Sequence, residues 1–157
     1  MNTQEINEIF SRTPAKKFFR GTFPSDVDFE HFKTPYCCIT NTDSHNGKGS
    51  HWNAWFVTKD LIYFFDSFGR RPTDDTFPNS YRNFVKNRKY MYNPKIVQGL
   101  FSDTCGQFCI YVLYFKCLNY DWVDILKSFN INSHVNDINM RKFVANLLIS
   151  NRCFIYL

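Results

Sequence analysis

The sequence predicts an α+β fold, in which a small, mostly antiparallel sheet packs against helices and one helix is buried at the centre. Two aromatic, β-rich runs at 53–57 and 61–65 are separated by three residues, a spacing typical of an antiparallel hairpin. Residues 105–118 are apolar on almost every side, which indicates a buried helix. With 157 residues the chain suits one compact unit, so we expect a single domain over 1–157.

The other elements are predicted from shorter patterns. Residues 2–10 have the pattern of an amphipathic helix with Thr3 as its N-cap. Residues 11–34 are expected to be irregular, because prolines and a glycine interrupt them. The remaining elements are a strand at 36–40, a polar loop at 41–50, a helix within 74–86 that is interrupted near Pro78, a strand within 90–98 centred around 95–97, and helices at 121–129 and 135–149.

The chain is mildly basic. A formal charge of +5 favours anionic partners such as nucleic acid, although an ordinary basic surface would give the same value. No apolar run approaches the roughly 20 residues that span a bilayer, so we expect no membrane partner.

The cysteines are expected to be mostly free thiols. An even number would suit a disulfide framework, but residues 1–10 are polar and acidic, unlike a secretory signal. Half of the cysteines also fall in the apolar 105–118 helix, where a thiol behaves as a small buried hydrophobe. We therefore expect a reducing compartment. The six cysteines are Cys37, Cys38, Cys105, Cys109, Cys117 and Cys153.

Cys105 is the candidate nucleophile because it stands where the buried helix begins. Asp103 or Thr104 could cap that helix, and the thiol would then lie at the positive end of the helix dipole, which favours the reactive thiolate. Gly106 is expected to leave the approach to the thiol open. Cys109, one turn further on, is expected to be a core thiol.

His51 and Asp66 are brought together by the predicted hairpin. If a four-residue connection joins the strands, residue 56 faces 61 and His51 faces Asp66. Opposed side chains have Cβ atoms roughly 4.5–5.5 Å apart, so the carboxylate would hold the imidazole tautomer and stabilise its cation. Taken alone, His51 could equally be a surface histidine at a wet loop end.

Gln98 is the candidate oxyanion donor. It follows the strand predicted around 95–97, and the short segment 99–103 leads back to Cys105. That segment would bring the Gln98 amide near the thiol, and backbone N–H groups at the helix start would complete an oxyanion hole. An isolated glutamine would otherwise serve surface solubility.

A zinc site is an alternative interpretation of the same cysteines and histidines. His51 with Cys105 and Cys109, or His31 with the adjacent pair Cys37-Cys38, would supply zinc ligands. The chain has no C-x-x-C pair, and adjacent cysteines are poorly spaced for tetrahedral zinc, so we expect no metal.

Several stretches in this order carry a resemblance: Phe18-Phe19-Arg20-Gly21-Thr22-Phe23, Ile39-Thr40-Asn41-Thr42, Gly49-Ser50-His51-Trp52, Tyr63-Phe64-Phe65-Asp66-Ser67-Phe68-Gly69, Val97-Gln98-Gly99 and Cys105-Gly106-Gln107-Phe108-Cys109. They resemble adenain, the adenovirus endopeptidase family, over residues 15–120. Asp66 and the stretch from Asp103 to Gly106 also resemble the SUMO/ubiquitin-like proteases. Adenain-type enzymes of Polinton/Maverick-type elements and related viruses fit equally well.

The resemblance implies an adenain/Ulp-like cysteine protease fold, with His51 as general base, Asp66 as its orienter, Cys105 as nucleophile and Gln98 in the oxyanion hole. It implies cleavage of viral capsid and core precursor proteins at Gly-containing sites, in the virion and the host cell interior. No cofactor is required for this chemistry, and we expect a monomer.

The resemblance also implies stimulation by DNA and by a disulfide-linked activating peptide. This chain departs from the adenain pattern in two ways. Asp66 stands where adenain has Glu, and the chain has no cysteine between Cys38 and Cys105 to accept such a peptide. Basic residues remain available for DNA: Arg82, Lys86, Arg88, Lys89 and Lys95.

Two alternatives stay open at the level of the sequence. An isopeptidase acting on ubiquitin-like modifiers would use the same residues, and comparing a ubiquitin-like conjugate with a capsid precursor as substrate would separate the two. A non-catalytic DNA-binding virion protein would use the basic charge and the aromatic residues beside it, Tyr81 and Tyr90, and its binding would weaken steeply with salt.

Overall fold

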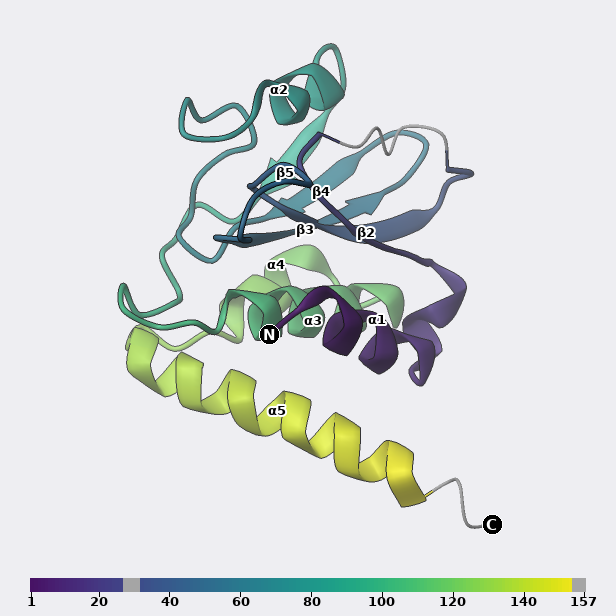
Figure 1. The fold of residues 1–157 in the computed structure, drawn as a ribbon, viewed down its shortest axis with the longest axis vertical. Coiled ribbons are helices and arrows are strands. Elements are labelled where there is room, and N and C mark those ends of the chain that lie inside the picture. Colours follow the sequence, from purple (N-terminus) through teal and green to yellow (C-terminus); the bar gives the residue numbers. More distant parts are fainter. Residues whose placement is uncertain (27–31, 154–157) are drawn as a thin grey trace.

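The computed structural model describes residues 1–26 and 32–153, and side chains up to residue 150. Within these residues the helices and strands form layers, with a five-stranded sheet at the centre (Figure 1). In chain order they are α1 (Thr3–Ser11), the 3-10 helix η1 (Pro14–Lys17), β1 (Phe19–Phe23), β2 (Tyr36–Asn41), β3 (Trp52–Val57), β4 (Ile62–Phe65), α2 (Asn79–Val85), β5 (Tyr90–Tyr92), α3 (Cys105–Cys117), α4 (Trp122–Lys127) and α5 (Ser133–Cys153).

The α+β class is confirmed, and the sheet is mixed. Its strands lie in chain order, β1-β2-β3-β4-β5. The central strands β2, β3 and β4 are antiparallel, whereas the edge strands β1 and β5 each run parallel to their neighbour. The antiparallel part predicted from the hairpin is therefore the middle of the sheet.

Both edge strands differ from the prediction. β1 and η1 lie in the stretch 11–34 that was predicted to be irregular. Pro14 is the first residue of η1 and does not interrupt regular structure there. Gly21, at φ 124°, lies at the register shift of β1. The strand predicted within 90–98 is present but lies at Tyr90–Tyr92; its placement around 95–97 is wrong, because Asn93 bonds both the N–H and the C=O of Lys95 and turns the chain there. The strand next to β4 is β5.

The register of the β3–β4 hairpin also differs from the prediction. Ala54 pairs with Phe65, and the Thr58 N–H donates to the Leu61 carbonyl at 2.9 Å. The connection is thus a two-residue turn, which places Asp66 level with residue 53 and not with 51. Because a slip by an even number of residues keeps each side chain on its face, Asp66 still faces the same side as His51.

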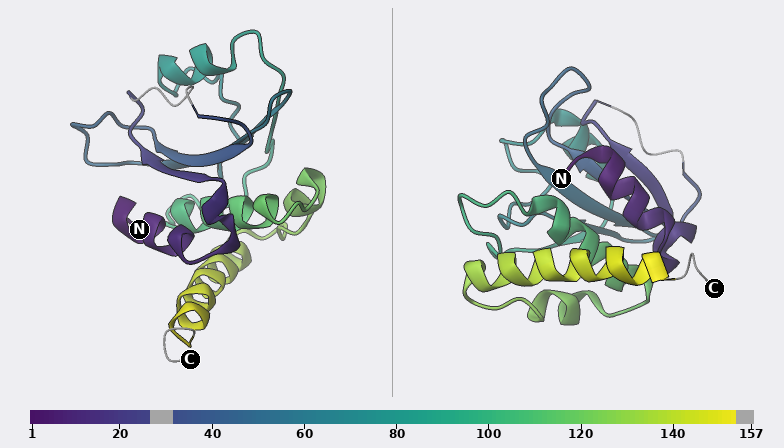
Figure 2. Two further views of the ribbon diagram at one scale, coloured as in Figure 1. Left: turned by 90° about the vertical axis from the view of Figure 1, so that its right-hand side faces the viewer. Right: turned by 60° about the horizontal axis from the view of Figure 1, so that its bottom comes forward.

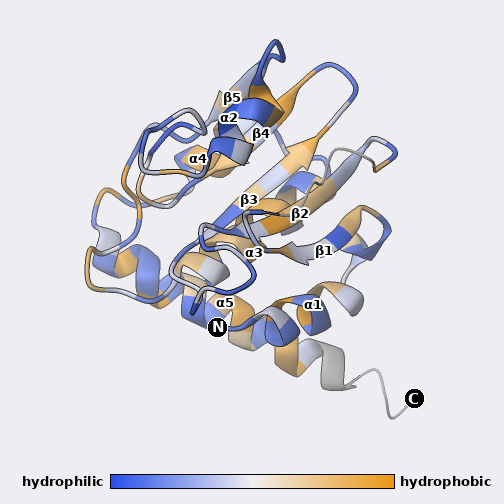
Figure 3. Ribbon diagram, turned by 45° about the horizontal axis from the view of Figure 1, so that its top comes forward, coloured by the Kyte–Doolittle hydropathy of each residue, from blue (hydrophilic) through white to orange (hydrophobic). Residues whose placement is uncertain are grey.

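The two faces of the sheet carry separate cores. Alternate side chains of β2, β3 and β4 pack against α1, α3 and α4 on one face, and the others pack against α2 on the opposite face. Apolar residues are concentrated on the central strands and on α3 (Figure 3). The second core contains Tyr36, Cys38, Trp55, Val57, Ile62, Phe64, Phe77, Tyr81, Phe84 and Val85.

Helix α3 is the buried central helix that its all-round apolar pattern predicted. It packs against the sheet on one side and against α5 on the other (Figure 2). The N-cap of α1 is Asn2, one residue before the predicted Thr3, because the Asn2 side chain accepts from the Glu5 N–H at 2.9 Å and its backbone N–H donates to the Glu5 carboxylate at 2.8 Å. Within the described residues, no helix is long and apolar enough to cross a bilayer.

Candidate active site

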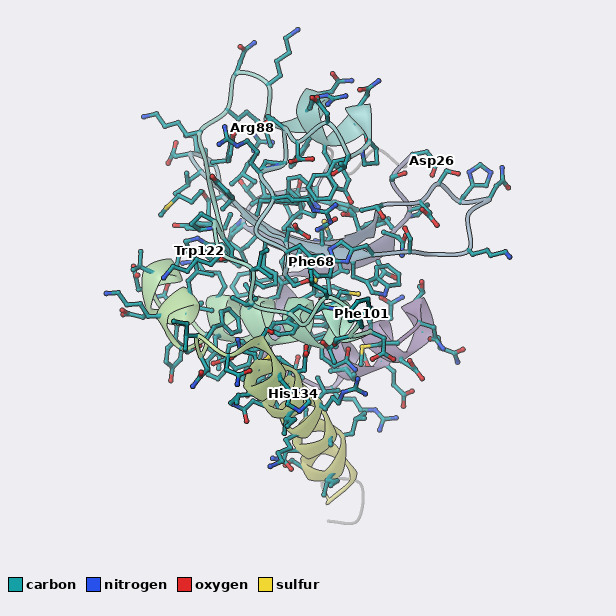
Figure 4. The ribbon with its side chains drawn as sticks, turned by 90° about the vertical axis from the view of Figure 1, so that its left-hand side faces the viewer. Asp26, Phe68, Arg88, Phe101, Trp122 and His134 are labelled. Carbon is teal, nitrogen blue, oxygen red and sulfur yellow. The ribbon has the colours of Figure 1, made fainter. Side chains whose placement is uncertain are left out.

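A cleft of about 420 Å³ opens where the ends of β3 and β4 meet the start of α3. Three of the four predicted site residues line it, namely His51, Gln98 and Cys105, and Asp66 contacts His51. Phe68 and Phe101 lie on the side of the molecule that faces the viewer in Figure 4. The other lining residues are Met1, Gly49, Ser50, Trp52, Phe68, Leu100, Ser102 and Asp103.

His51 and Asp66 form a short hydrogen bond, with 2.5 Å between imidazole Nε2 and carboxylate Oδ1. The predicted pairing is therefore present, although the strand register that suggested it was wrong by two residues. Asp66 is fully buried and His51 is 9% exposed. The ring of His51 also packs on Phe68, with 5.1 Å between centroids. The imidazole is held in one orientation as a result.

Two further residues, neither of them predicted from the sequence, donate hydrogen bonds to the Asp66 carboxylate. Asn53 donates from Nδ2 to Oδ1 at 3.0 Å, and it is the residue level with Asp66 in the observed register. Arg70 donates to Oδ2 from its backbone N–H at 3.0 Å and from Nε at 2.9 Å. The tight turn from Asp66 to Gly69 brings Arg70 back, and this Asp-Ser-Phe-Gly turn was the available signal.

These contacts set the charge of the pair. Burial acts to raise the pKa of Asp66, but the hydrogen bonds from His51 and Arg70 outweigh it and the net pKa is lowered. Burial likewise acts to lower the pKa of His51, and the hydrogen bonds to Asp66 and Cys105 outweigh it, so the net pKa is raised. An anionic carboxylate therefore stands behind an imidazole that is readily protonated.

Cys105 is the first residue of α3 and is partly exposed. Burial acts to raise the pKa of its thiol, but the hydrogen bond and charge of His51 and the backbone N–H groups of Trp52 and Gly106 outweigh it, so the net pKa is lowered. The predicted side-chain cap is wrong: the Thr104 hydroxyl donates to Asp137 at 2.6 Å, and Asp103 pairs with Arg141. The helix start still favours the thiolate.

Gly106 has a different role from the predicted one. It is buried, and a Cβ there would lie 3.2 Å from Met1 Sδ and 3.3 Å from Trp52 Cδ1. The Trp52 indole N–H in turn donates to the Met1 carbonyl at 3.2 Å. The missing side chain therefore lets Met1 and Trp52 pack closely beside Cys105, and does not serve to keep the approach open.

Gln98 is buried at the wall of the cleft. Its Oε1 accepts from the Ser67 hydroxyl at 2.6 Å, and its Nε2 donates to the Ser102 carbonyl at 2.7 Å. Since an amide nitrogen carries two N–H groups, a second donor remains for a bound molecule. The Ser67 contact links Gln98 to the turn that carries Asp66.

The other described thiols lie in the core. Cys109 is fully buried, and burial raises the pKa of its thiol well above the ordinary value. The Cys37 and Cys117 sulfur atoms lie 3.6 Å apart as free thiols. Among the residues that the structure describes, no three His, Cys, Asp or Glu side chains could hold a metal ion together. His31, named in the zinc alternative, lies outside the described residues.

The proteins similar to this chain in sequence include proteases of adenoviruses. The chain is 27% identical over 124 residues to the protease of Bovine adenovirus 2. The matched region covers 71% of this chain and 60% of that protein. It is 31% identical over 129 residues to the protease of Porcine adenovirus A serotype 3, covering 71% and 62%. The chain thus spans less than two thirds of the length of these relatives. No protein-family model matches it.

Among solved structures, the ASFV pS273R protease is similar to this chain, with a TM-score of 0.65 over 93% of this chain and 66% of that one. The two sequences are 20% identical, so the likeness is one of fold. It confirms the protease fold that the resemblance to adenain implied.

Proposed function

Because the chain is related in sequence to the adenovirus proteases and shares the fold of the ASFV pS273R protease, we propose that it is a cysteine endopeptidase that cleaves viral structural precursor proteins during virion maturation. It acts in the virion and in the interior of the host cell. The observation that carries the proposal is the partly exposed Cys105 at the start of α3, in one cleft with an imidazole held by a buried carboxylate.

The proposed reaction begins with the thiolate of Cys105. Asp66 occupies Nε2 of His51, which leaves Nδ1 to exchange a proton with the thiol. The thiolate attacks the peptide carbonyl, and the amide N–H of Gln98 and the backbone N–H of Cys105 stabilise the oxyanion. His51 then donates its proton to the leaving amine as the C–N bond breaks. Water, deprotonated by His51, hydrolyses the thioester and restores the thiol.

The shape of the cleft supports a peptide substrate with small residues at the cleaved bond. Met1 and Trp52 pack over Gly106 beside the nucleophile, which narrows the space at the thiol. Leu100 and Phe101, at 72% and 105% exposure, offer apolar contacts at the rim for larger side chains further along the peptide. We propose cleavage at Gly-containing sites on this basis and on the resemblance to adenain.

DNA is proposed as a stimulating partner, and the monomer as the active form. Arg88 lies at the end of the molecule away from Phe68 and Phe101 (Figure 4), so DNA would bind apart from the cleft. A disulfide-linked activator is harder to place: among the cysteines whose side chains are described, all except Cys105 are buried. Binding through phosphates predicts a log–log salt slope of about −0.9 per contact, and a flat response would count against DNA.

The test of the proposed function is the hydrolysis of a Gly-Gly-containing peptide by Cys105→Ala. We expect no turnover from this variant. Cys109→Ala is the matched control, because it removes a thiol one turn away on the same helix that is buried and outside the cleft. It should retain activity. Turnover by Cys105→Ala would overturn the proposal.

A further inference from the structure

The segment 98–104 connects the proposed oxyanion donor to the proposed nucleophile, and its tip is exposed. Gln98 stands at one end and Cys105 follows the other. The side chains at the tip, Leu100 and Phe101, point into solvent, with 72% and 105% exposure. Apolar packing therefore does not fix the tip of this segment, although the segment joins the oxyanion donor to the nucleophile.

One buried carboxylate binds the segment at three points. Asp137 of α5 is 7% exposed. Its Oδ2 accepts from the Gly99 backbone N–H at 3.1 Å, and its Oδ1 accepts from the Ser102 hydroxyl at 2.9 Å and from the Thr104 hydroxyl at 2.6 Å. Gly99 lies immediately after Gln98 and Thr104 immediately before Cys105, so a single side chain fixes both ends.

The neighbouring residue on α5 holds the chain just before the segment. Asn136 is 2% exposed, and its Nδ2 donates to the carbonyls of Val97 at 3.0 Å and Asn130 at 2.9 Å. Its Oδ1 accepts from the Asn130 N–H at 2.7 Å. The first turn of α5 is thereby fixed to the chain on the Gln98 side, which gives Asp137 a firm base.

Ser102 links Asp137 to Gln98 through two hydrogen bonds. Its hydroxyl donates to Asp137, and its backbone carbonyl accepts from Gln98 Nε2 at 2.7 Å. A shift of Ser102 would therefore turn the Gln98 amide, and hydrogen-bond donors that miss the developing oxyanion by a fraction of an ångström lose much of their effect.

We propose that Asp137 is a positioning residue for the oxyanion hole, whose carboxylate sets the conformation of 98–104 so that the Gln98 amide and the Cys105 backbone N–H converge on one point. The proposal rests on the proposed function. It assigns to α5 a part in the reaction through the segment, while the reactivity of the thiol is set by His51.

Two rates measured on the same variant separate this role from general support of the fold. Peptide hydrolysis needs the oxyanion hole, whereas alkylation by iodoacetamide, in which the thiolate displaces iodide, develops no oxyanion at the carbonyl. In Asp137→Ala we expect kcat to fall about 10²-fold, as for loss of an oxyanion donor. The alkylation rate of Cys105 should stay within about twofold of the wild type, and its pH profile should not shift, because His51 and not Asp137 sets the reactivity of the thiol.

A second variant breaks the same contact from the other side. A Cβ at residue 99 would lie 2.7 Å from Asp137 Oδ2, so Gly99→Ala must displace the carboxylate. Gly99→Ala should lower kcat and leave the alkylation rate of Cys105 unchanged. If Asp137→Ala does not fold, Gly99→Ala and Asp137→Asn test the positioning role in its place. Lys142→Ala, which changes an exposed residue of the same helix that lies outside the cleft, is the control and should match the wild type.

The outcomes are distinct. An equal fall of hydrolysis and alkylation in the folded variants would mean that Asp137 only supports the fold, and unchanged hydrolysis would mean that it has no part in the reaction. Either result overturns the proposal. Failure of the proposed function shows itself separately, as turnover by Cys105→Ala.

Discussion

The two sides of the cleft are built in different ways. On the sheet side, His51 and Asp66 stand at the ends of two adjacent strands, and every partner of Asp66 described above lies within the stretch 51–70. On the helix side, Gln98 and Cys105 stand at the two ends of a segment with an exposed tip, which Asp137 fixes from a later helix. The sheet side is local in sequence, and the helix side depends on tertiary structure.

This difference divides the proposed chemistry. The sheet side determines how readily the thiolate forms, because His51 lowers the pKa of Cys105. The helix side determines how well the oxyanion is held. Variants on the sheet side should therefore change alkylation and hydrolysis together, and variants on the helix side should change hydrolysis alone.

The largest effect is expected from His51→Ala. Loss of the general base and of the imidazolium should lower hydrolysis by about 10³-fold or more. Because His51 holds the pKa of Cys105 down, its removal should raise that pKa, and the pH at which alkylation sets in should move upward. Alkylation measured across pH checks this; an unchanged profile would show that His51 does not act on the thiol.

Asp66→Asn should have the next largest effect. The amide can no longer stabilise the imidazolium, so the pKa of His51 should fall and kcat should drop by about 10²-fold. The thiolate then forms only at higher pH, and alkylation near neutral pH should slow as well. Asp60→Asn, in the turn at the other end of the same hairpin, is the matched control. Equal activity of the two variants would contradict the role of Asp66.

Arg70→Met should have a smaller effect on the same side. It removes the side-chain bonds to Asp66 and keeps the backbone one, a loss of about 1.5 kcal/mol that corresponds to roughly tenfold in kcat. The pKa of Asp66 should rise, since Arg70 helps to lower it. Steady-state kinetics with a parallel alkylation assay measures this. A fall in hydrolysis with unchanged alkylation would show that Arg70 does not act through the His51–Asp66 pair.

The smallest effect is expected from Ser102→Ala on the helix side. One of the three donors to Asp137 is lost while the others remain, which is worth about 1 kcal/mol, or roughly fivefold in kcat. Alkylation of Cys105 should not change. A parallel loss of alkylation would show that the two sides are not separable in this way.

The sequence was sufficient where the information is local. The hairpin prediction placed His51 beside Asp66 although the turn is two residues shorter than assumed, because a slip by two keeps side chains on the same face. β1 was missed since its glycine permits a bulge that looks like a break in the pattern.

Other features depend on parts of the chain that come together only in the fold. Asp137 lies in an ordinary-looking stretch of α5, and its partners 99, 102 and 104 carry no pattern that points to it. Gly106 was misinterpreted because the close packing of Met1 and Trp52 on it joins three separate segments.

The most direct test is to label the protein near neutral pH with a thiol-reactive peptide probe and to map the modified cysteine by mass spectrometry. The pairing of a partly exposed Cys105 with His51 predicts label at Cys105 that is lost in His51→Ala. Label at other cysteines only, or at Cys105 to the same extent in both proteins, would contradict a thiol hydrolase built on this site.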